Sequence, residues 1–406
     1  MSGFRPTFYS GGLFCIVTAL FISCGLPKNR PDTGKHITIE NAPLHNDSIE
    51  KIRALLNANE KAQRLDSLFK YMFLHGGFNG NVLVAQQGQV IYKKSWGYAN
   101  YVTKDSLNLN SVFQMGSSSK PLTATAILIL KEQGLIRLSQ TIDEFFPDFP
   151  YKKITVRDLL THRSGLANYM YFCDSFYCYK NIPLTNDELL KLMITNHPLP
   201  YFKPNRRFEY SNTNYALLVN IIEKVSGVSY SDFMKQEIFK PIGMKNSRVS
   251  ISDTIDLSHN RTIGYESNWK KYDIDYLDGV LGDKNIFTTI DDLFLFDQAL
   301  YTEQLLKKET LDEAYSGTSH EHPGLRNYGY GWRLIDEKDG TKIVYHNGWW
   351  HGYNNVFYRR LKDKTTIIIL SNKINRGIYH IEGILNILDG SGMTENIFEE
   401  EGSAVN

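Results

Sequence analysis

The 406-residue sequence carries no strong excess of charge of either sign. Its 45 lysine and arginine residues are balanced by 44 aspartate and glutamate residues, so the formal net charge is +1 at pH 7. Nucleic-acid-binding domains usually present a basic excess on one face, and neither half of this chain has a long basic run. The balance of charge therefore argues against a polyanionic partner.

Several catalytic motifs are also missing. The sequence has no glycine-x-serine-x-glycine elbow, which argues against the α/β-hydrolase class of enzymes. It has no HExxH motif, P-loop or dinucleotide-binding glycine motif. These absences mean that the sequence implies neither a metal ion nor a nucleotide cofactor.

The apolar run near the N-terminus, residues 13–22, is too short to span a bilayer comfortably. It lies between Arg5 and Cys24, a pattern typical of a lipoprotein signal peptide over residues 1–24. We expect Cys24 to be the lipidated first residue of an exported protein. A polar tether over residues 25–50 would then hold the protein on a membrane surface, periplasmic or outer. A short membrane anchor and ordinary secretory cleavage remain alternatives.

Cysteine is scarce, with four residues in the chain. Cys15 would leave with the signal peptide and Cys24 would carry lipid, so Cys173 and Cys178 would remain. Their spacing permits a disulfide in an exported compartment, but spacing alone does not show that the two side chains converge. Without a histidine at zinc-site spacing a metal site is weakly supported, and the histidines at residues 320–322 are more typical of a solvated loop.

The sequence does contain a serine and a lysine three residues apart at the start of a predicted helix. Ser117 follows a glycine and a strand-like run, and Lys120 precedes an apolar segment with the composition of a helix. Residues at this spacing share one face of the first helical turn, so the amine can reach the hydroxyl. The same spacing recurs at residues 48–51, 67–70 and 267–270, but there it lacks the combination of glycine, strand and helix.

Two further patterns follow Ser117 in the chain. Tyr210 and Asn212 stand two residues apart before a helical run, and His346 and Gly348 end a strand-like run. Serine-x-x-lysine, tyrosine-x-asparagine and histidine-x-glycine, in this order, form the triplet of the penicillin-recognising serine hydrolases. The chain therefore resembles the class C β-lactamases, the DD-peptidases and the esterases related to them.

The resemblance covers a hydrolase domain over residues 51–390, followed by a tail over residues 391–406. It implies an α/β (α+β) fold, in which an antiparallel sheet has terminal helices on one face and receives an inserted, mainly helical lobe at about residues 117–275. The hydrophobic pattern independently predicts that the sheet is assembled from both ends of the sequence. The predicted elements are a helix over residues 52–73, a hairpin over 81–92, strands near 342–345, 354–358 and 365–370, and a final helix over about 377–388.

The resemblance also implies a role for each motif residue. Ser117 would be the acylated nucleophile, and Lys120, if neutral, would take its proton. Burial and a helix N-terminus both favour a neutral amine. Tyr210 would share this task and then protonate the leaving group, while Asn212 would orient Lys120 and donate its amide to the substrate.

Acyl transfer also needs donors aimed at the developing oxyanion. By resemblance, these are the backbone N–H groups of Ser117 and Trp349. Gly348 would let its strand approach the substrate closely. The Trp349 side chain could narrow the groove or pack in the core, and the sequence favours neither.

His346 departs from the β-lactamase pattern, in which a lysine usually fills this position. Lysine offers a permanent cation for a substrate carboxylate, whereas histidine is mostly neutral at pH 7 unless its pKa is raised. We therefore expect peptidase or esterase action rather than efficient antibiotic hydrolysis. His162 lies among apolar residues and is expected to be a buried, hydrogen-bonded structural residue, and the role of His351 stays open.

The sequence thus predicts an exported, lipid-anchored serine hydrolase that needs no cofactor. Peptides containing D-amino acids, derived from peptidoglycan, are the leading substrates. A small-ester hydrolase with the same residues is one alternative, and a non-catalytic sensor of cell-wall fragments is another. The intact triplet of motifs favours an enzyme over a sensor.

Overall fold

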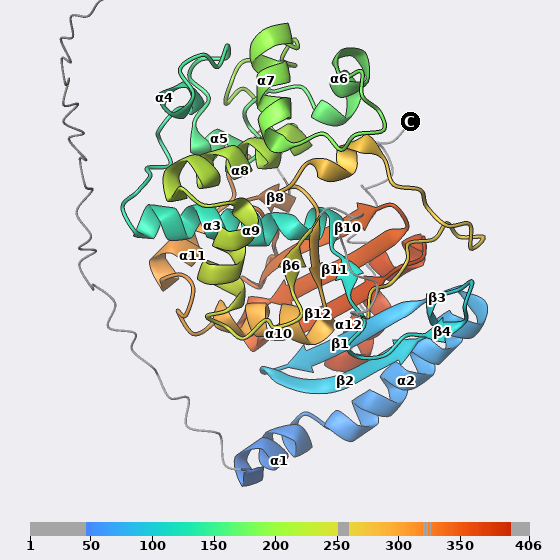
Figure 1. Cartoon of the computed structure of the whole chain (residues 1–406). Helices are drawn as coiled ribbons and strands as arrows, with labels where there is room; N and C mark the ends of the chain where they lie inside the picture. Colours follow the sequence, from blue (N-terminus) through green and yellow to red (C-terminus); the bar gives the residue numbers. More distant parts are fainter. Residues whose placement is uncertain (1–45, 251–259, 320, 322–323, 325, 391–406) are drawn as a thin grey trace, which may run out of the picture. The chain divides into compact units, whose positions relative to one another are not determined.

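The computed structural model describes residues 46–250, 260–319, 321, 324 and 326–390 (Figure 1). The predicted signal peptide, most of the predicted tether and the C-terminal tail lie outside the described residues. No helix in the described part of the chain is both long enough and apolar enough to cross a membrane.

A seven-stranded antiparallel sheet forms the centre of the fold, with its strands in the order β2-β1-β12-β11-β10-β9-β8. The first and last strands of the sequence that belong to it, β1 and β12, are neighbours, and Gly80 pairs with Ser371. This confirms the prediction that both ends of the sequence build the sheet. The strands are β1 (Gly80–Gln86), β2 (Gln89–Trp96), β8 (Arg326–Tyr328), β9 (Arg333–Asp336), β10 (Lys342–Trp350), β11 (Tyr353–Arg360) and β12 (Thr365–Ser371).

Two separate apolar cores cover the two faces of the sheet. Successive side chains of a strand point to opposite faces, so Val82 and Ile367 join one core while Leu83 and Ile368 join the other. Because both faces are buried, β12 carries a continuous apolar run, Ile367 to Leu370, instead of alternating apolar and polar residues. Two terminal helices complete the first core, as predicted: α2 (Ala58–His75) and α12 (Glu382–Asp389). The short helix α1 (Asn46–Leu55) precedes them and adds no residue to this core.

The N-terminal helix differs from the prediction of one helix over residues 52–73. α1 ends at Leu55 and α2 begins at Ala58, and Asn57 between them has a left-handed φ of 51°. Asparagine adopts this conformation more easily than most residues with a Cβ, so the chain can break there. The predicted final helix is also divided, because a 3₁₀ turn over Arg376–Tyr379 precedes α12.

The second core is built largely from the middle of the chain, which is mainly helical from Ser117 to Phe239. α3 is buried at every position from Lys120 to Leu130, since it passes through the centre of this core. The helices here are α3 (Lys120–Glu132), α4 (Ile142–Phe145), α5 (Val156–Leu160), α6 (Tyr169–Phe176), α7 (Asn186–Asn196), α8 (Asn212–Ser226) and α9 (Tyr230–Phe233), followed by a π-helical turn, Met234–Phe239.

The remaining elements connect the helical region to the sheet. Two small sheets are formed by β5, β7 and β6 and by β3 and β4. Short 3₁₀ turns, η1 and η4, border the motif residues described below. The bounds are β3 (Tyr98–Asn100), β4 (Asp105–Ser106), β5 (Phe113–Gln114), η1 (Gly116–Ser119), β6 (Arg248–Val249), η4 (Tyr276–Gly279), β7 (Ile286–Thr288), α10 (Ile290–Ala299), α11 (Lys308–Ala314) and η5 (Leu361–Asp363).

Candidate active site

Ser117 lies in the turn η1, which leads from β5 into the buried helix α3. The preceding Gly116 has a left-handed φ of 50°, and a Cβ added to it would lie 3.0 Å from the backbone nitrogen of Trp349. A side chain is disfavoured there by both the backbone conformation and the lack of space. The turn therefore holds the partly exposed Ser117 against β10, the strand that carries the histidine-x-glycine motif.

Two side chains reach the Ser117 hydroxyl. Lys120 Nζ and the Tyr210 hydroxyl each lie 3.0 Å from Ser117 Oγ and donate a hydrogen bond to it. Lys120 is the first residue of α3, whereas Tyr210 comes from the segment just before α8. The structure thus brings together three residues that the sequence analysis selected from two distant motifs.

The Lys120 amine is enclosed by the protein. Its side chain is fully buried, and Nζ also donates to the carbonyl oxygen of Asp283 at 3.1 Å. Nζ lies 4.9 Å from the centre of the Tyr210 ring and 5.6 Å from that of Tyr215. The amine is therefore held next to Ser117 in a place shielded from solvent.

The structure places Asn212 differently from the prediction. Its Nδ2 lies 2.8 Å from Met170 Sδ, and its Oδ1 is buried without a hydrogen-bond partner. Asn212 Oδ1 therefore accepts no hydrogen bond from Lys120, whose Nζ donates to the backbone carbonyl oxygen of Asp283. Asn212 is the first residue of α8, and from there its side chain turns toward α6, where Met170 lies.

His346 is fully buried on β10. Its Nδ1 donates to the carbonyl oxygen of Asn347 at 2.7 Å, so in the neutral ring Nε2 accepts from the Tyr328 hydroxyl at 3.1 Å. Burial, together with the positive charges of Arg333 and Lys120, keeps the pKa of His346 well below its ordinary value. The imidazole is therefore neutral at pH 7 and supplies no cation.

A cation that the sequence analysis missed lies beside Tyr210. Arg333 on β9 places its Cζ 5.5 Å from the centre of the Tyr210 ring, and its side chain is partly exposed. Its charge lowers the pKa of both His346 and His162. Arg333 lies beside β10 because it pairs with Tyr345 in the sheet, a strand register that the local sequence does not encode.

Gly348 is needed for packing inside the protein. A Cβ at this position would lie 2.0 Å from the carbonyl oxygen of Met115 and 2.9 Å from Ser118 Oγ. The missing side chain lets β10 press against η1, whereas the sequence analysis expected it to make room for substrate. The next residue, Trp349, is partly exposed, with its ring centre 6.4 Å from that of Trp350.

His162 is buried and hydrogen-bonded, as predicted, but its neighbours belong to the site. Its Nδ1 accepts from the backbone N–H of Ser211 at 3.2 Å, and its ring centre lies 4.3 Å from that of Tyr210. Burial and then the charge of Lys120 keep the pKa of His162 well below its ordinary value. A second neutral imidazole therefore lies next to Tyr210.

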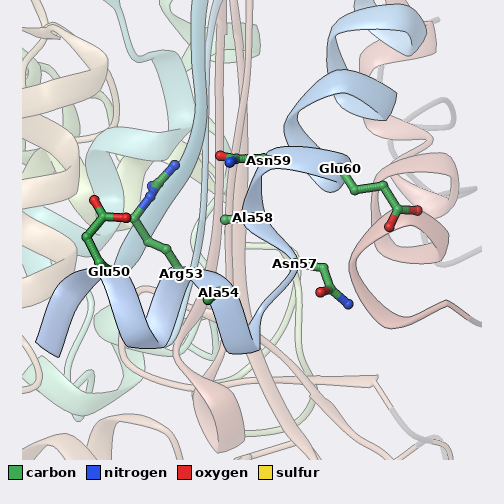
Figure 2. A pocket seen from close by; sticks show the side chains of 7 residues that line it. All are labelled: Glu50, Arg53, Ala54, Asn57, Ala58, Asn59 and Glu60. Carbon is green, nitrogen blue, oxygen red and sulfur yellow. The ribbon is translucent and has the colours of Figure 1, made fainter. Parts of the chain in front are cut away.

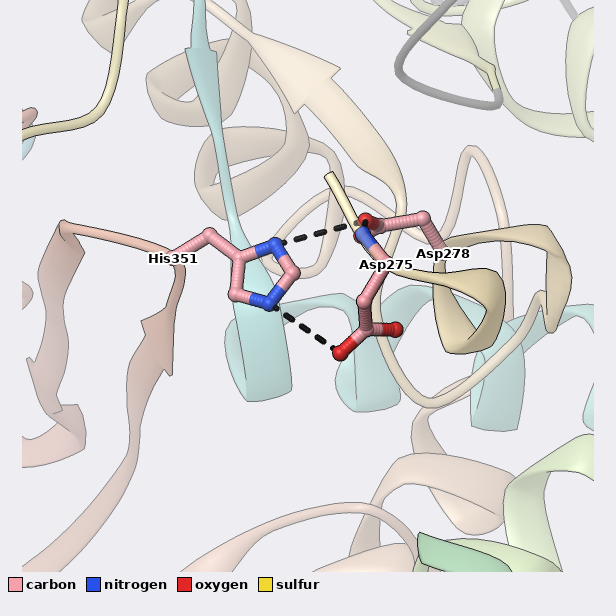
Figure 3. Close-up of side chains that lie close together, drawn as sticks. All are labelled: Asp275, Asp278 and His351. Atoms are coloured by element: carbon pink, nitrogen blue, oxygen red, sulfur yellow. Dashed lines mark hydrogen bonds and ion pairs between the residues drawn. The ribbon is translucent and has the colours of Figure 1, made fainter. Parts of the chain in front are cut away.

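His351 lies in the turn after β10 and faces two carboxylates (Figure 3). Its Nδ1 is 3.3 Å from Asp278 and its Nε2 is 3.6 Å from Asp275. Burial alone would lower the pKa of His351, but the bonds and charges of the two aspartates outweigh it and raise the pKa to about 9. The donor atoms lie within 4.8 Å of one another, as in a metal site. We assign the cluster as an ion-paired triad, since a protonated ring satisfies both carboxylates.

Two other features contribute nothing to the site. Cys173 is buried and Cys178 is exposed, and both are free thiols rather than a disulfide. A surface hollow lies around the break between α1 and α2 (Figure 2), and none of the motif residues lines it. Its lining consists of Glu50, Arg53, Ala54, Asn57, Ala58, Asn59 and Glu60.

Comparisons with known proteins show the family of the chain. The family model described as Beta-lactamase matches residues 70–388. Penicillin-binding protein 4* of Bacillus subtilis (strain 168) is 37% identical over 331 residues, which cover 77% of this chain and 72% of that protein.

Solved structures show the same fold. The octameric penicillin-binding protein homologue from Pyrococcus abyssi is 26% identical, with a TM-score of 0.71 over 81% of this chain and 77% of that one. The D-amino acid amidase from Ochrobactrum anthropi SV3, solved with L-phenylalanine amide, is 23% identical, with a TM-score of 0.67 over 83% of this chain and 99% of that one.

Proposed function

The chain belongs to the beta-lactamase family and is a serine hydrolase, and we propose that it cleaves amide bonds of D-amino-acid peptides through an acyl-enzyme on Ser117. One observation carries the proposal: Ser117 Oγ lies 3.0 Å from both Lys120 Nζ and the Tyr210 hydroxyl. The likeness to a penicillin-binding protein and to a D-amino acid amidase supports the substrate class.

In the first half of the reaction, Ser117 Oγ attacks the substrate carbonyl carbon and its proton passes to Lys120 and Tyr210. The Tyr210 hydroxyl then donates a proton to the leaving nitrogen as the carbon–nitrogen bond breaks, which leaves an ester on Ser117. In the second half, water attacks this ester and gives a proton to the same pair. Ser117 regains its hydrogen when the acid is released.

The oxyanion of each tetrahedral intermediate needs preorganised donors. We assign the backbone N–H groups of Ser117 and Trp349 to this role. The proposal is supported by the close approach of Gly116 to the Trp349 nitrogen and by the packing of Gly348 on η1. Two glycines with no room for a side chain thus bring the turn and the strand together.

A peptide substrate that ends in a carboxylate needs a cation near the scissile bond. His346 is neutral, so Arg333 is our candidate for this contact, because it lies beside Tyr210 and is partly exposed. A guanidinium can bind a carboxylate with two parallel hydrogen bonds. A small uncharged ester is the second candidate substrate, favoured by the neutral state of His346.

The proposal is tested by following the intact mass of the tether-free protein over time with benzylpenicillin, with Ser117→Ala as the control. We expect an adduct of the drug that persists and requires Ser117. Rapid loss of the adduct with drug turnover would instead indicate a β-lactamase. A fluorophosphonate that still labels Ser117→Ala would overturn Ser117 as the nucleophile.

We also propose that the protein is exported and anchored through lipid on Cys24. The support is the pattern of residues 1–24, which lie outside the described part of the chain. Full-length protein should partition into detergent, and Cys24→Ser should partition into the aqueous phase. Equal partitioning of the two proteins would refute the anchor.

A further inference from the structure

One residue, His162, binds the backbone on both sides of Tyr210. The carbonyl oxygen of His162 accepts from the N–H of Glu209 at 2.8 Å, and its Nδ1 accepts from the N–H of Ser211 at 3.2 Å. Glu209 and Ser211 are the chain neighbours of Tyr210, which lies in an irregular segment before α8. His162 therefore fixes the path of the chain at the residue that is to carry a proton.

The imidazole also supports the phenol ring. The centres of the His162 and Tyr210 rings are 4.3 Å apart, with an angle of 37° between the planes. On its other sides the imidazole contacts Tyr328 at 4.9 Å and Tyr215 at 5.2 Å. Because the imidazole is itself packed between rings, Tyr210 cannot tilt toward it without displacing that group.

The hydrogen bonds show where the imidazole proton lies. Asn214 Oδ1 accepts from Ser164 Oγ at 2.5 Å, so it is Asn214 Nδ2 that faces His162 Nδ1 at 3.0 Å. With the Ser211 N–H directed at the same atom, Nδ1 is the acceptor and the proton of the neutral ring is on Nε2. Nε2 is buried and has no hydrogen-bond partner.

This arrangement is costly for the folded protein. A buried donor without a partner is unfavourable, and His162 also has a left-handed φ of 54°, which is uncommon for a residue with a Cβ. An apolar side chain would avoid the unsatisfied donor, but it could not accept the hydrogen bonds at Nδ1. Replacing His162 with an apolar, non-aromatic residue would remove both the acceptor at Nδ1 and the contact with the Tyr210 ring.

We propose that His162 is a positioning residue for Tyr210, holding its backbone through two acceptors and its ring by packing. The inference rests on the proposed function, in which Tyr210 transfers protons to and from Ser117 and the leaving group. His162 would not touch substrate. It would keep the Tyr210 hydroxyl within hydrogen-bond reach of Ser117 Oγ while protons move.

Two substitutions separate the two contributions. His162→Phe keeps a ring but removes the acceptor, whereas His162→Asn offers Oδ1 as an acceptor and suits the left-handed backbone, but removes the ring. His197→Asn is the matched control, since His197 also has a left-handed φ, of 48°, but is exposed at the end of α7. Thermal unfolding shows which variants are folded. If His162→Phe does not fold, His162→Asn alone is enough for the test.

The readout is kcat/KM, which reports the steps up to acylation, on two substrates with the same acyl group, D-alanine p-nitroanilide and D-alanine p-nitrophenyl ester. The anilide nitrogen must be protonated as it leaves, whereas p-nitrophenolate leaves without a proton. On the anilide we expect losses of about 10²-fold for His162→Phe and roughly tenfold for His162→Asn, with KM nearly unchanged. Losses on the ester should be smaller, and His197→Asn should match the native protein. Equal losses on both substrates would overturn the inference.

A double-mutant cycle with Tyr210→Phe completes the test. If His162 acts through the Tyr210 hydroxyl, adding His162→Asn to Tyr210→Phe should slow anilide cleavage no further. Additive losses would refute the inference and leave the proposed function standing. A normal rate for Tyr210→Phe alone would instead refute the role of Tyr210 in the proposed function.

Discussion

The surroundings of Tyr210 and the turn after β10 form two sides of the structure near the motif residues, and they follow opposite electrostatic principles. Beside Tyr210, two buried histidines, His162 and His346, are kept neutral by burial and by nearby positive charge. In the turn after β10, His351 is charged and lies between the carboxylates of Asp275 and Asp278. Neutral rings lie beside Tyr210, the proposed proton carrier, and ion pairs hold the turn that follows Trp349, the proposed backbone donor.

The largest effect is expected when the hydroxyl group of Tyr210 is removed. Tyr210→Phe should lower kcat on D-alanine p-nitroanilide by about 10²–10⁴-fold, the usual worth of general acid–base help. The melting temperature should stay close to that of the native protein, and Tyr71→Phe, an exposed tyrosine on α2, should leave the rate unchanged. A near-normal rate for Tyr210→Phe would show that the surroundings of Tyr210 are not where protons are transferred.

On the charged side, the larger effect should be on stability. Asp278 is fully buried, and besides His351 it accepts from Trp350 Nε1 at 2.6 Å. Asp278→Asn should lower the free energy of unfolding by about 3 kcal/mol, because it leaves a buried charge without its partner. Asp275→Asn is the matched control: its side chain is 44% exposed, and it should cost less than about 1 kcal/mol. Denaturant unfolding of the two variants measures the difference, and equal costs would contradict the assignment.

The pH dependence of stability tests whether His351 is charged, in contrast to the neutral histidines beside Tyr210. His351 has its pKa raised from 6.5 to about 9 in the folded state, so its contribution is complete below pH 6.5 and is lost as the pH rises through 9. Because a tenfold change in proton affinity corresponds to about 1.4 kcal/mol, the loss is at most about 3.5 kcal/mol. Unfolding measured from pH 6 to 10 should show a decline that is reduced in His351→Gln. An identical decline in both proteins would show that other groups cause it.

The smallest effect is expected at Asn212. Because its Oδ1 does not bind Lys120, Asn212→Ala should lower kcat by less than about tenfold and act mainly on KM, as expected for lost substrate binding. Steady-state kinetics on the anilide give both constants. A loss of kcat as large as that of Tyr210→Phe would restore the predicted role in orienting Lys120.

The fold could be predicted from the sequence to a large extent. Apolar runs near residues 365–370 and 81–85 indicated strands, and the segment after Ser117 indicated helices, because burial imposes these patterns on the sequence. The break at Asn57 could not be predicted. The spacing of apolar residues indicates a helix, but it does not show that one residue within it adopts a left-handed φ.

The site could be predicted only where residues are close in sequence or belong to a motif. Ser117 and Lys120 share a helical turn, so their contact follows from local geometry. Arg333 and His162 reach Tyr210 through strand register and loop packing, which no local pattern encodes. The direction of the Asn212 side chain likewise depends on Met170, a neighbour from another helix.

The pairing of β1 with β12 also determines when the fold can close during synthesis. β1 is made early, yet on one side its partner is β12, with Gly80 opposite Ser371. Until the last strand has emerged, β1 and β11 both keep an unpaired edge, which is a template for pairing with other chains. Contacts so distant in sequence also slow folding. We therefore expect a nascent chain that stops before Thr365 to be sensitive to proteases and prone to aggregate, even though all three motifs have already been translated.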